Sequence, residues 1–264
     1  LAVARLVKAH SGTVALAGEN ILQKEAEDLR QTRQKVQFIF QDPYSSLNPR
    51  KRAEAIVREP LDSLSQKTEV EKAKIVDELF EAVGLRPEQQ RLFPHQFSGG
   101  QRQRIGIARA LATQPELIIC DEPVSALDVA VQAQILNLLR KLQKDFGLTY
   151  LFISHDLGVV QHMSDSIAVM YMGRVVEHAD RLSLFQTPRH PYTQALLSAV
   201  PTVDRAKRAQ QKRILIPGDP PDPVNLPLGC RFANRCPVAE AICQTVEPEL
   251  KSDANGHRTA CHLV

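Results

Sequence analysis

The sequence predicts an α/β fold with a mainly parallel sheet, an inserted helical segment and an irregular C-terminal extension. Two short apolar segments, residues 117–120 and 150–153, lack the alternation of half-exposed strands, which predicts strands covered on both faces. Residues 129–146 lie between them, with apolar side chains at helical spacing and Gly147 at the end. A strand, a helix and a strand in this order form the crossover that joins parallel strands.

Composition sets the broad class. The 264 residues suffice for one large domain with an appendage, or for two small domains. Hydrophobic residues make up 43% and charged residues 24%, which excludes a collagen-like or wholly disordered chain. The apolar runs are far shorter than the roughly 20 residues of a membrane span, and no secretory signal pattern opens the chain. The net charge of +3, with 5% aromatic residues and no tryptophan, does not indicate binding to nucleic acid.

The first part of the chain predicts one helix and two strands. Residues 1–8 have helical spacing but no N-cap before them, so we expect a helix in progress and an upstream segment that is missing. A turn at Ser11 and Gly12 follows, and residues 13–17 and 36–40 are strand-like.

The middle and the end of the chain differ in composition. Residues 44–113 are predicted to be helical, and a stripe over residues 71–83 ends at Gly84. Beyond about residue 187 prolines accumulate, with one helix near residues 192–199 and four cysteines at the end. These shifts predict a first domain over residues 1–187 and an extension over residues 188–264.

The sharpest chemical signal is the end of the first apolar strand. Residues 117–123 (LIICDEP) bring Asp121 and Glu122 to the carboxyl end of the strand, the edge where open α/β sheets bind ligands. Successive residues diverge there, so Asp121 could hold Mg²⁺ while Glu122 polarises an attacking water. A solvated turn before Pro123 is the structural alternative.

A second signal lies at residues 97–104 (FSGGQRQR). Ser98 and Gln101 have the spacing of a capping box, which is a purely structural use. Gly99 and Gly100 would let a bulky anion approach the N–H groups and the positive dipole end of a helix start. The arginines of this string are expected to be solvated.

Two further strands end in polar side chains. Residues 150–156 (YLFISHD) present His155, a candidate hydrogen-bond partner for a transferring phosphate, although a single histidine is more often structural. Residues 38–43 (FIFQDP) present Gln41, whose amide could ligate Mg²⁺ or orient water.

These strings, in this order, resemble the ATPase subunits of ATP-binding cassette (ABC) transporters. The matching motifs are the glutamine loop, the signature, the Walker B pair, the loop after it and the switch histidine, at Gln41, Ser98-Gly-Gly-Gln101, Asp121 with Glu122, Ser125-Ala-Leu-Asp128 and His155. Residues 42–50, residues 188–197 and the cysteine-rich tail are similar to the second ATPase subunit of bacterial oligopeptide/dipeptide importers, a group that includes nickel importers.

The resemblance implies a P-loop NTPase-like core with an inserted helical subdomain, about residues 44–113, and with ATP and Mg²⁺ as ligands. It implies that Glu122 is the general base and that Asp121 serves Mg²⁺. Gln41 senses the metal and couples to the permease, and His155 contacts the γ-phosphate. The signature, through Ser98 and Gly100, reaches the partner's nucleotide, and Asp128 lies at the dimer seam.

The same resemblance implies the partners. Two ATPase subunits, identical or different, face head to tail and sandwich two nucleotides, and they act on two permease subunits. A substrate-binding protein completes the complex, which imports peptides or similar small solutes. The chain is then peripheral to the inner membrane on its cytosolic side.

One motif of the family is absent from the sequence. No Gly-x-x-x-x-Gly-Lys-Ser/Thr stretch occurs, so the amides and the lysine that cradle phosphates are missing, and the adenine-stacking aromatic is missing with them. We therefore expect weak ATP binding by this chain in its own site, and we expect the sequence to be a fragment of a competent subunit. The stretch after Ala9 also looks shortened.

The cysteine tail predicts a metal site. Cys230, Cys236, Cys243 and Cys261 suit a tetrahedral zinc ion or an iron–sulfur cluster, and four unrelated thiols are the alternative. Resemblance to the importer subunits favours a 4Fe–4S cluster. Cys120, which ends an apolar strand, is expected to be an inert core residue.

Two other functions compete with an importer ATPase. A soluble ABC ATPase without a permease, as in DNA repair or translation, would usually carry paired cassettes or long insertions. A non-catalytic cassette that lends only its signature to a partner would explain the missing phosphate loop.

Overall fold

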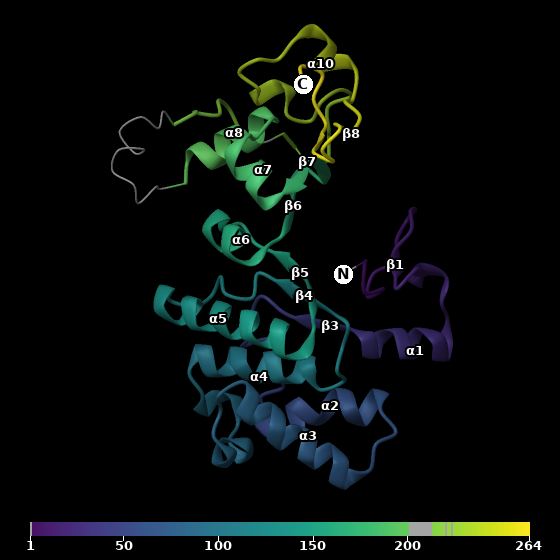
Figure 1. The fold of residues 1–264 in the computed structure, drawn as a ribbon, viewed down its shortest axis with the longest axis vertical. Helices are drawn as coiled ribbons and strands as arrows, with labels where there is room; N and C mark the ends of the chain where they lie inside the picture. The colour runs from purple at the N-terminus through teal and green to yellow at the C-terminus, as the bar shows by residue number, and fades with distance from the viewer. Residues whose placement is uncertain (1, 201–212, 220, 223) are drawn as a thin grey trace. The chain divides into compact units, whose positions relative to one another are not determined.

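The computed structural model describes residues 2–200, 213–219, 221, 222 and 224–264. Leu1, where the first predicted helix begins, and part of the predicted proline-rich extension lie outside these residues. The chain divides into two compact units, Leu1–His155 and Asp156–Val264 (Figure 1).

The sheet of the first unit has three parallel strands in the order β3-β4-β5, namely β3 (Val36–Ile39), β4 (Leu117–Asp121) and β5 (Thr149–Ile153). Ile39 pairs with Cys120, and Asp121 pairs with Ile153. The carboxyl ends of the three strands therefore meet at one edge, as the sequence predicts.

Helix α5 (Val129–Phe146) forms the predicted crossover between β4 and β5. Asp128 caps its first turn, and Gly147 ends it with a φ of 65°, a left-handed conformation that glycine adopts without steric cost. The buried side chains Ile135 and Leu139 recur at helical spacing and give α5 its apolar face.

The expectation that both apolar strands are covered on both faces is wrong for β5. Ile118 and Ile119 of β4 are buried, whereas Leu151 is 41% exposed and Ile153 is 45% exposed. The reason is position: β4 is the central strand, while β5 is an edge strand of the described sheet.

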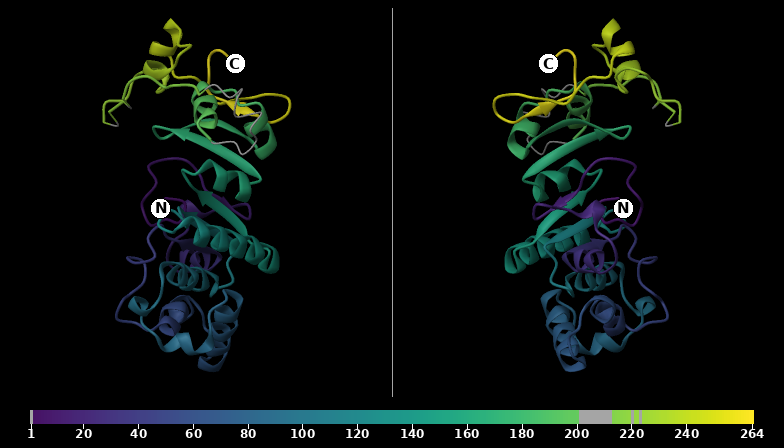
Figure 2. Two further views of the ribbon diagram at one scale, coloured as in Figure 1. Left: turned by 90° about the vertical axis from the view of Figure 1, so that its left-hand side faces the viewer. Right: turned by 90° about the vertical axis from the view of Figure 1, so that its right-hand side faces the viewer.

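Three helices pack against one another in the first unit, α2 (Ala53–Leu64), α3 (Glu69–Ala82) and α4 (Gly99–Leu111), and α4 packs on β3. Helix α4 lies between α5 on one side and the α2–α3 pair on the other, as both Figure 1 and Figure 2 show. Two 3₁₀ turns, η2 (Pro87–Arg91) and η3 (Pro94–Gln96), join α3 to α4. The helices predicted over residues 44–113 are therefore confirmed.

The N-terminal segment differs from the expectation. Residues 2–5 form a turn rather than a helix, with Arg5 at a φ of 53° and its N–H bonded to the Ala2 carbonyl. So short a segment forms a helix only when it packs against other elements, because nucleation is costly. The segment continues through elements that the sequence analysis reduced to one strand: β1 (Ala15–Leu16), β2 (Glu19–Asn20), η1 (Ile21–Gln23) and α1 (Ala26–Lys35).

The second unit contains an antiparallel sheet in the order β6-β7-β9-β8: β6 (Ser166–Tyr171), β7 (Arg174–Asp180), β8 (Lys251–Ser252) and β9 (Arg258–Thr259). Its helices are α6 (Leu157–Met163), α7 (Arg181–Gln186), α8 (Pro191–Ser198), η4 (Ala233–Arg235) and α10 (Ala241–Thr245). Val160, Tyr171, Leu184 and Phe232 belong to its core. The strand β9 of the tail pairs directly with β7.

In the described part of the chain, the structure contains no helix that is both long and apolar enough to span a membrane.

Candidate functional site

Three polar side chains meet at the carboxyl ends of the parallel strands. Glu122 follows β4, and its Oε2 accepts a hydrogen bond from Gln41 Nε2 at 2.8 Å. His155 follows β5, and its Nδ1 lies 3.1 Å from Glu122 Oε1. The sequence placed these three residues on separate strand ends, and the structure brings them together around one carboxylate.

The backbone of Glu122 is held in an unusual conformation. Its φ of 45° lies in the left-handed region, which is costly for a residue with a Cβ atom. The Glu122 N–H donates to the Ile153 carbonyl at 3.0 Å, and the Glu122 carbonyl accepts from the N–H and the hydroxyl of Ser125. Such strain persists only where neighbouring bonds hold it, and it occurs most often at functional sites.

The site is open to solvent. The side chain of Glu122 is 24% exposed and that of His155 is 73% exposed. Asp121, the last residue of β4, is partly buried, and Gln41 is exposed. Asp121 contributes carboxylate oxygens and Gln41 an amide oxygen, which are the hard ligands that Mg²⁺ prefers, so the donor set fits that ion.

The signature string begins α4. Ser98 is its N-cap, and the predicted capping box is present: the Gln101 N–H donates to Ser98 Oγ at 3.4 Å, and the Ser98 N–H donates to Gln101 Oε1 at 3.0 Å. The side chain of Ser98 is exposed. The structural role of this pair is confirmed, and its role toward a nucleotide stays a prediction.

The two glycines of the signature lie against the loop that follows Glu122. A Cβ on Gly100 would stand 2.5 Å from Val131 Cγ1, and one on Gly99 would stand 3.4 Å from Leu127 Cδ2. Asp128, which is exposed, accepts a hydrogen bond from the Val131 N–H at 2.9 Å. The glycines therefore let the starts of α4 and α5 approach each other, a use that the sequence analysis missed.

The expectation that the arginines of this string are solvated is wrong. Arg102 is partly buried, and its Nε donates to the Pro94 carbonyl at 2.6 Å. Arg104 is also partly buried and donates to the Val83 carbonyl. Arginine has several donors on a long stem, so it can cap carbonyls that end neighbouring turns while its methylenes pack.

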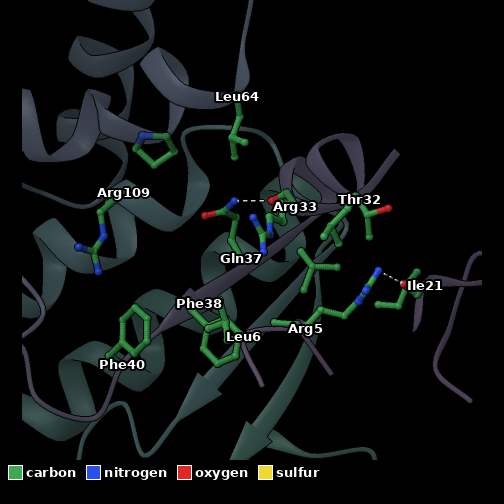
Figure 3. A pocket seen from close by; sticks show the side chains of 14 residues that line it. Arg5, Leu6, Ile21, Thr32, Arg33, Gln37, Phe38, Phe40, Leu64 and Arg109 are labelled. Atoms are coloured by element: carbon green, nitrogen blue, oxygen red, sulfur yellow. Dashed lines mark hydrogen bonds between the residues drawn. The ribbon is translucent and has the colours of Figure 1, made fainter. Parts of the chain in front are cut away.

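A cavity of about 230 Å³ lies elsewhere in the first unit, lined by the N-terminal segment, α1, β3, two residues of α2 and Arg109 of α4 (Figure 3). Phe38 and Phe40 stack along one side of it with ring centroids 5.4 Å apart. Neither Asp121, Glu122 nor His155 lines this cavity. The candidate site at the strand edge is therefore separate from this cavity.

The predicted metal site in the tail is not supported. Among the described residues, no group of three or more His, Cys, Asp or Glu side chains could hold a metal ion, although Cys230, Cys236, Cys243 and Cys261 are all described. Burial raises the pKa of the Cys230 and Cys236 thiols, and the nearby cysteines raise it further. The four thiols are thus near enough to affect one another's pKa, but the described structure does not support a cluster at them.

Cys120 is buried, and burial raises the pKa of its thiol, as expected for an inert core residue.

A buried carboxylate that the sequence analysis did not identify organises the second unit. Glu177 on β7 accepts hydrogen bonds from the N–H groups of Arg189 and His190 at 2.7 and 3.0 Å, and His257 Nε2 lies 2.7 Å from it. Glu177 is fully buried. Burial lowers the pKa of His190 to about 4, and its ring Nδ1 accepts the Tyr192 N–H. A lone Glu inside a strand gave no sequence signal for this role.

Comparison with known families finds two matches. A family model described as "ABC transporter" matches residues 1–125, and one described as "Oligopeptide/dipeptide transporter, C-terminal region" matches residues 176–243.

Known proteins of similar sequence span nearly the whole chain. The oligopeptide transport ATP-binding protein AppF of Bacillus subtilis is 50% identical over 98% of this chain and 79% of its own length. A putative oligopeptide transport ATP-binding protein of the same organism, YkfD, is 48% identical with the same coverage. The probable peptide ABC transporter ATP-binding protein y4tS of Sinorhizobium fredii is 47% identical over 98% of this chain and 73% of its length.

A solved structure is similar as well. The ATP-binding cassette MJ0796, in a dimeric post-hydrolysis state bound to ADP and phosphate, superposes with a TM-score of 0.60 at 30% identity. The match covers 68% of this chain and 78% of that one.

Proposed function

The chain belongs to the ABC transporter family, and from that premise we propose that it is the ATP-hydrolysing subunit of a bacterial importer of peptides or similar small solutes. The printed names of its relatives, which are oligopeptide and peptide transport ATP-binding proteins, support the substrate class. The match of residues 176–243 to the oligopeptide/dipeptide C-terminal region supports the same class.

The observation that carries the proposal is the convergence of Gln41 and His155 on Glu122. Glu122 is the general base: its carboxylate stands at the strand edge, partly exposed, where it can accept a proton from a water. Gln41, which follows β3, and His155, which follows β5, each contact one of the two carboxylate oxygens of Glu122. Each carboxylate oxygen keeps a lone pair that can accept from a water, so both residues can orient the base while it acts.

Asp121 and Gln41 would hold Mg²⁺ at this edge. The ion, when bound, neutralises charge on the phosphates of ATP. Asp121 belongs to β4, whose paired neighbours fix its backbone, so its carboxylate is positioned by the sheet rather than by a loop. His155 contributes an exposed ring that can contact a phosphate from the β5 side.

The signature acts toward a second ATPase subunit, identical or different. The exposed Ser98 and the N–H groups of Gly99, Gly100 and Gln101 begin α4, where the helix dipole favours phosphate. Asp128 is exposed beside them, at the start of α5, and suits a subunit boundary. The dimeric state of the related cassette MJ0796 supports a dimer.

The remaining partners follow from the family. Two permease subunits carry the solute, a substrate-binding protein delivers it, and this chain works from the cytosolic face of the membrane, with no nucleic acid. The helical subdomain, residues 44–113, faces the permease. The domain boundary near residue 187 stays part of this proposal.

Residues 1–264 include no phosphate-binding loop, so we expect these residues by themselves to bind ATP weakly. Equilibrium titration of the isolated chain with ATP and Mg²⁺ tests this. Micromolar affinity would overturn it, because the residues present would then suffice without the cradling amides and lysine.

A second candidate function is a non-catalytic cassette that lends its signature to a partner. The exposed signature at the start of α4 favours it. In that case Glu122→Gln leaves transport unchanged while Ser98→Arg abolishes it. A soluble ABC ATPase without a permease is a third candidate, which co-purification with permease subunits would exclude.

Uptake of a labelled oligopeptide by cells tests the leading proposal. Cells that express the chain with its permease and binding-protein genes should take up the peptide, and Glu122→Gln should abolish uptake at equal protein levels. Uptake that continues without this chain would reject the proposed function.

A metal centre is no part of the proposed mechanism. An iron–sulfur cluster, with zinc as the alternative, rests on the family resemblance of the four cysteines and lacks a converging ligand group in the described residues. Visible absorbance that is present in the anaerobically purified protein and lost in Cys236→Ser would show that a cluster is bound.

A further inference from the structure

Two arginines on one face of α4 reach the segment that follows Gln41. Arg102 and Arg109 are seven residues apart, close to two helical turns, so they share a face. The Cζ atom of Arg102 lies 3.9 Å from the centroid of the Tyr44 ring. Arg109 Nη1 donates to the Ser46 carbonyl at 2.6 Å.

Arg109 also contacts the residue before Gln41. Its Cζ atom lies 5.8 Å from the centroid of the Phe40 ring, and Figure 3 shows its side chain extending from α4 toward that ring. Burial lowers the pKa of Arg109, whose guanidinium remains charged. A charged donor held in a partly buried place makes a strong bond to a carbonyl, so this contact is a firm attachment.

The attached segment is a stiff turn. Asp42 accepts hydrogen bonds from the N–H groups of Tyr44 and Ser45 at 2.8 and 3.3 Å, and its carbonyl accepts the Ser46 N–H at 3.2 Å. Leu47, which is 2% exposed, anchors the far end of the turn in the core. A displacement at Ser46 therefore reaches Asp42 and Gln41 instead of being absorbed by a loose loop.

We propose that Arg109 is a positioning residue: by holding the Ser46 carbonyl from the signature helix, it fixes the turn over residues 42–47 and sets the placement of the Gln41 amide against Glu122. The role of Glu122 rests on the proposed function, whereas the hold of Arg109 on the turn does not. A movement of α4 would therefore change the position of Gln41 relative to Glu122 through the side chain of Arg109.

Hydrogen exchange of the full chain tests whether Arg109 stabilises the turn over residues 42–47. Arg109→Met keeps the length and packing of the stem and removes every donor, so we expect peptides over residues 42–47 to exchange at least about tenfold faster. Arg109→Lys restores one charged donor and should restore most of the protection. Arg30→Met is the matched control, because Arg30 also donates to a main-chain carbonyl, that of Ser63, at 3.0 Å. It should leave residues 42–47 unchanged.

Catalysis tests the link to the base. In the assembled transporter, Arg109→Met should lower kcat about tenfold at saturating ATP and leave KM within about twofold, while Arg30→Met changes neither.

Unchanged exchange over residues 42–47 in Arg109→Met overturns the proposal, and so does faster exchange with an unchanged kcat. If Arg109→Met unfolds, Arg109→Gln, which keeps a neutral donor, must show faster exchange confined to residues 42–47. A wild-type complex that does not hydrolyse ATP rejects the proposed function, and the exchange result still decides the hold of Arg109.

Discussion

Glu122 combines a left-handed backbone with a carboxylate shared between two neighbours. Its φ of 45° costs free energy of folding. The contacts with Gln41 and His155 offset little of this cost, because both partners are largely exposed. This strained backbone is consistent with the proposed role of Glu122 as the general base.

Replacing Glu122 with Asn should relieve this strain. Asn tolerates the left-handed region, so we expect Glu122→Asn to raise the free energy of unfolding by about 0.5–1 kcal/mol while removing the base. Chemical denaturation of both proteins measures the difference. Gln114→Asn is the control, since Gln114 has a φ of 54° outside the site and should gain stability without a functional cost. A loss of more than about 1 kcal/mol in Glu122→Asn would show that its contacts stabilise the fold.

His190 makes the stability of the chain depend on pH. The folded ring binds a proton only below about pH 4, whereas the unfolded ring does so near its ordinary pKa of about 6.5. Between these values the unfolded state binds more protons, so the free energy of unfolding falls as pH falls. The fall from about pH 7 to about pH 5 should be roughly 2 kcal/mol.

Denaturation of His190→Asn across that pH range tests the assignment. Asn keeps an acceptor at the N-cap of α8 but does not titrate, so the dependence on pH should flatten relative to the wild type. Parallel curves for the wild type and His190→Asn would refute the role of His190.

At the scale of elements, the starts of α4 and α5 depend on the missing side chain of Gly100. A methyl group there would stand 2.5 Å from Val131 Cγ1, so Gly100→Ala should destabilise the protein by about 1–3 kcal/mol. Val131→Ala in the same chain should recover part of that loss. Thermal unfolding measures both changes.

Gly106 is the matched control for this prediction, because it lies in the same helix and a Cβ there would meet nothing within 4 Å. Gly106→Ala should raise stability by up to about 1 kcal/mol. Equal effects of the two substitutions would mean that helix propensity, rather than the contact with Val131, decides the outcome.

Elements with strong periodic patterns were predictable. The bounds of α5 follow from its apolar spacing, Asp128 and Gly147, and β4 follows from its apolar run. Helix α1 was missed because its residues are almost all polar and carry no apolar stripe. The exposure of Leu151 and Ile153 on β5 was missed because a pattern within one strand does not give its position in the sheet.

At the scale of the whole molecule, the site was predictable where topology decides it. Parallel strands end at one edge, so Gln41, Asp121, Glu122 and His155 could be assigned to a common rim from the sequence. Their hydrogen bonds, the hold of Arg109 on Ser46 and the buried Glu177 depend on tertiary packing between distant segments. Local patterns contain no information on such contacts.

The most direct test of the central claim is the maximal rate of ATP hydrolysis by an assembled transporter whose two ATPase subunits are both this chain. At saturating ATP the rate does not depend on the affinity for ATP, so it reports the chemistry at the strand edge. We expect Glu122→Gln to lower this rate by about 10²-fold or more, and Ser98→Arg to lower it as well. If Ser98→Arg lowers the rate and Glu122→Gln leaves it unchanged, Glu122 is not the general base, because in this assembly the chain supplies the residues of both sites.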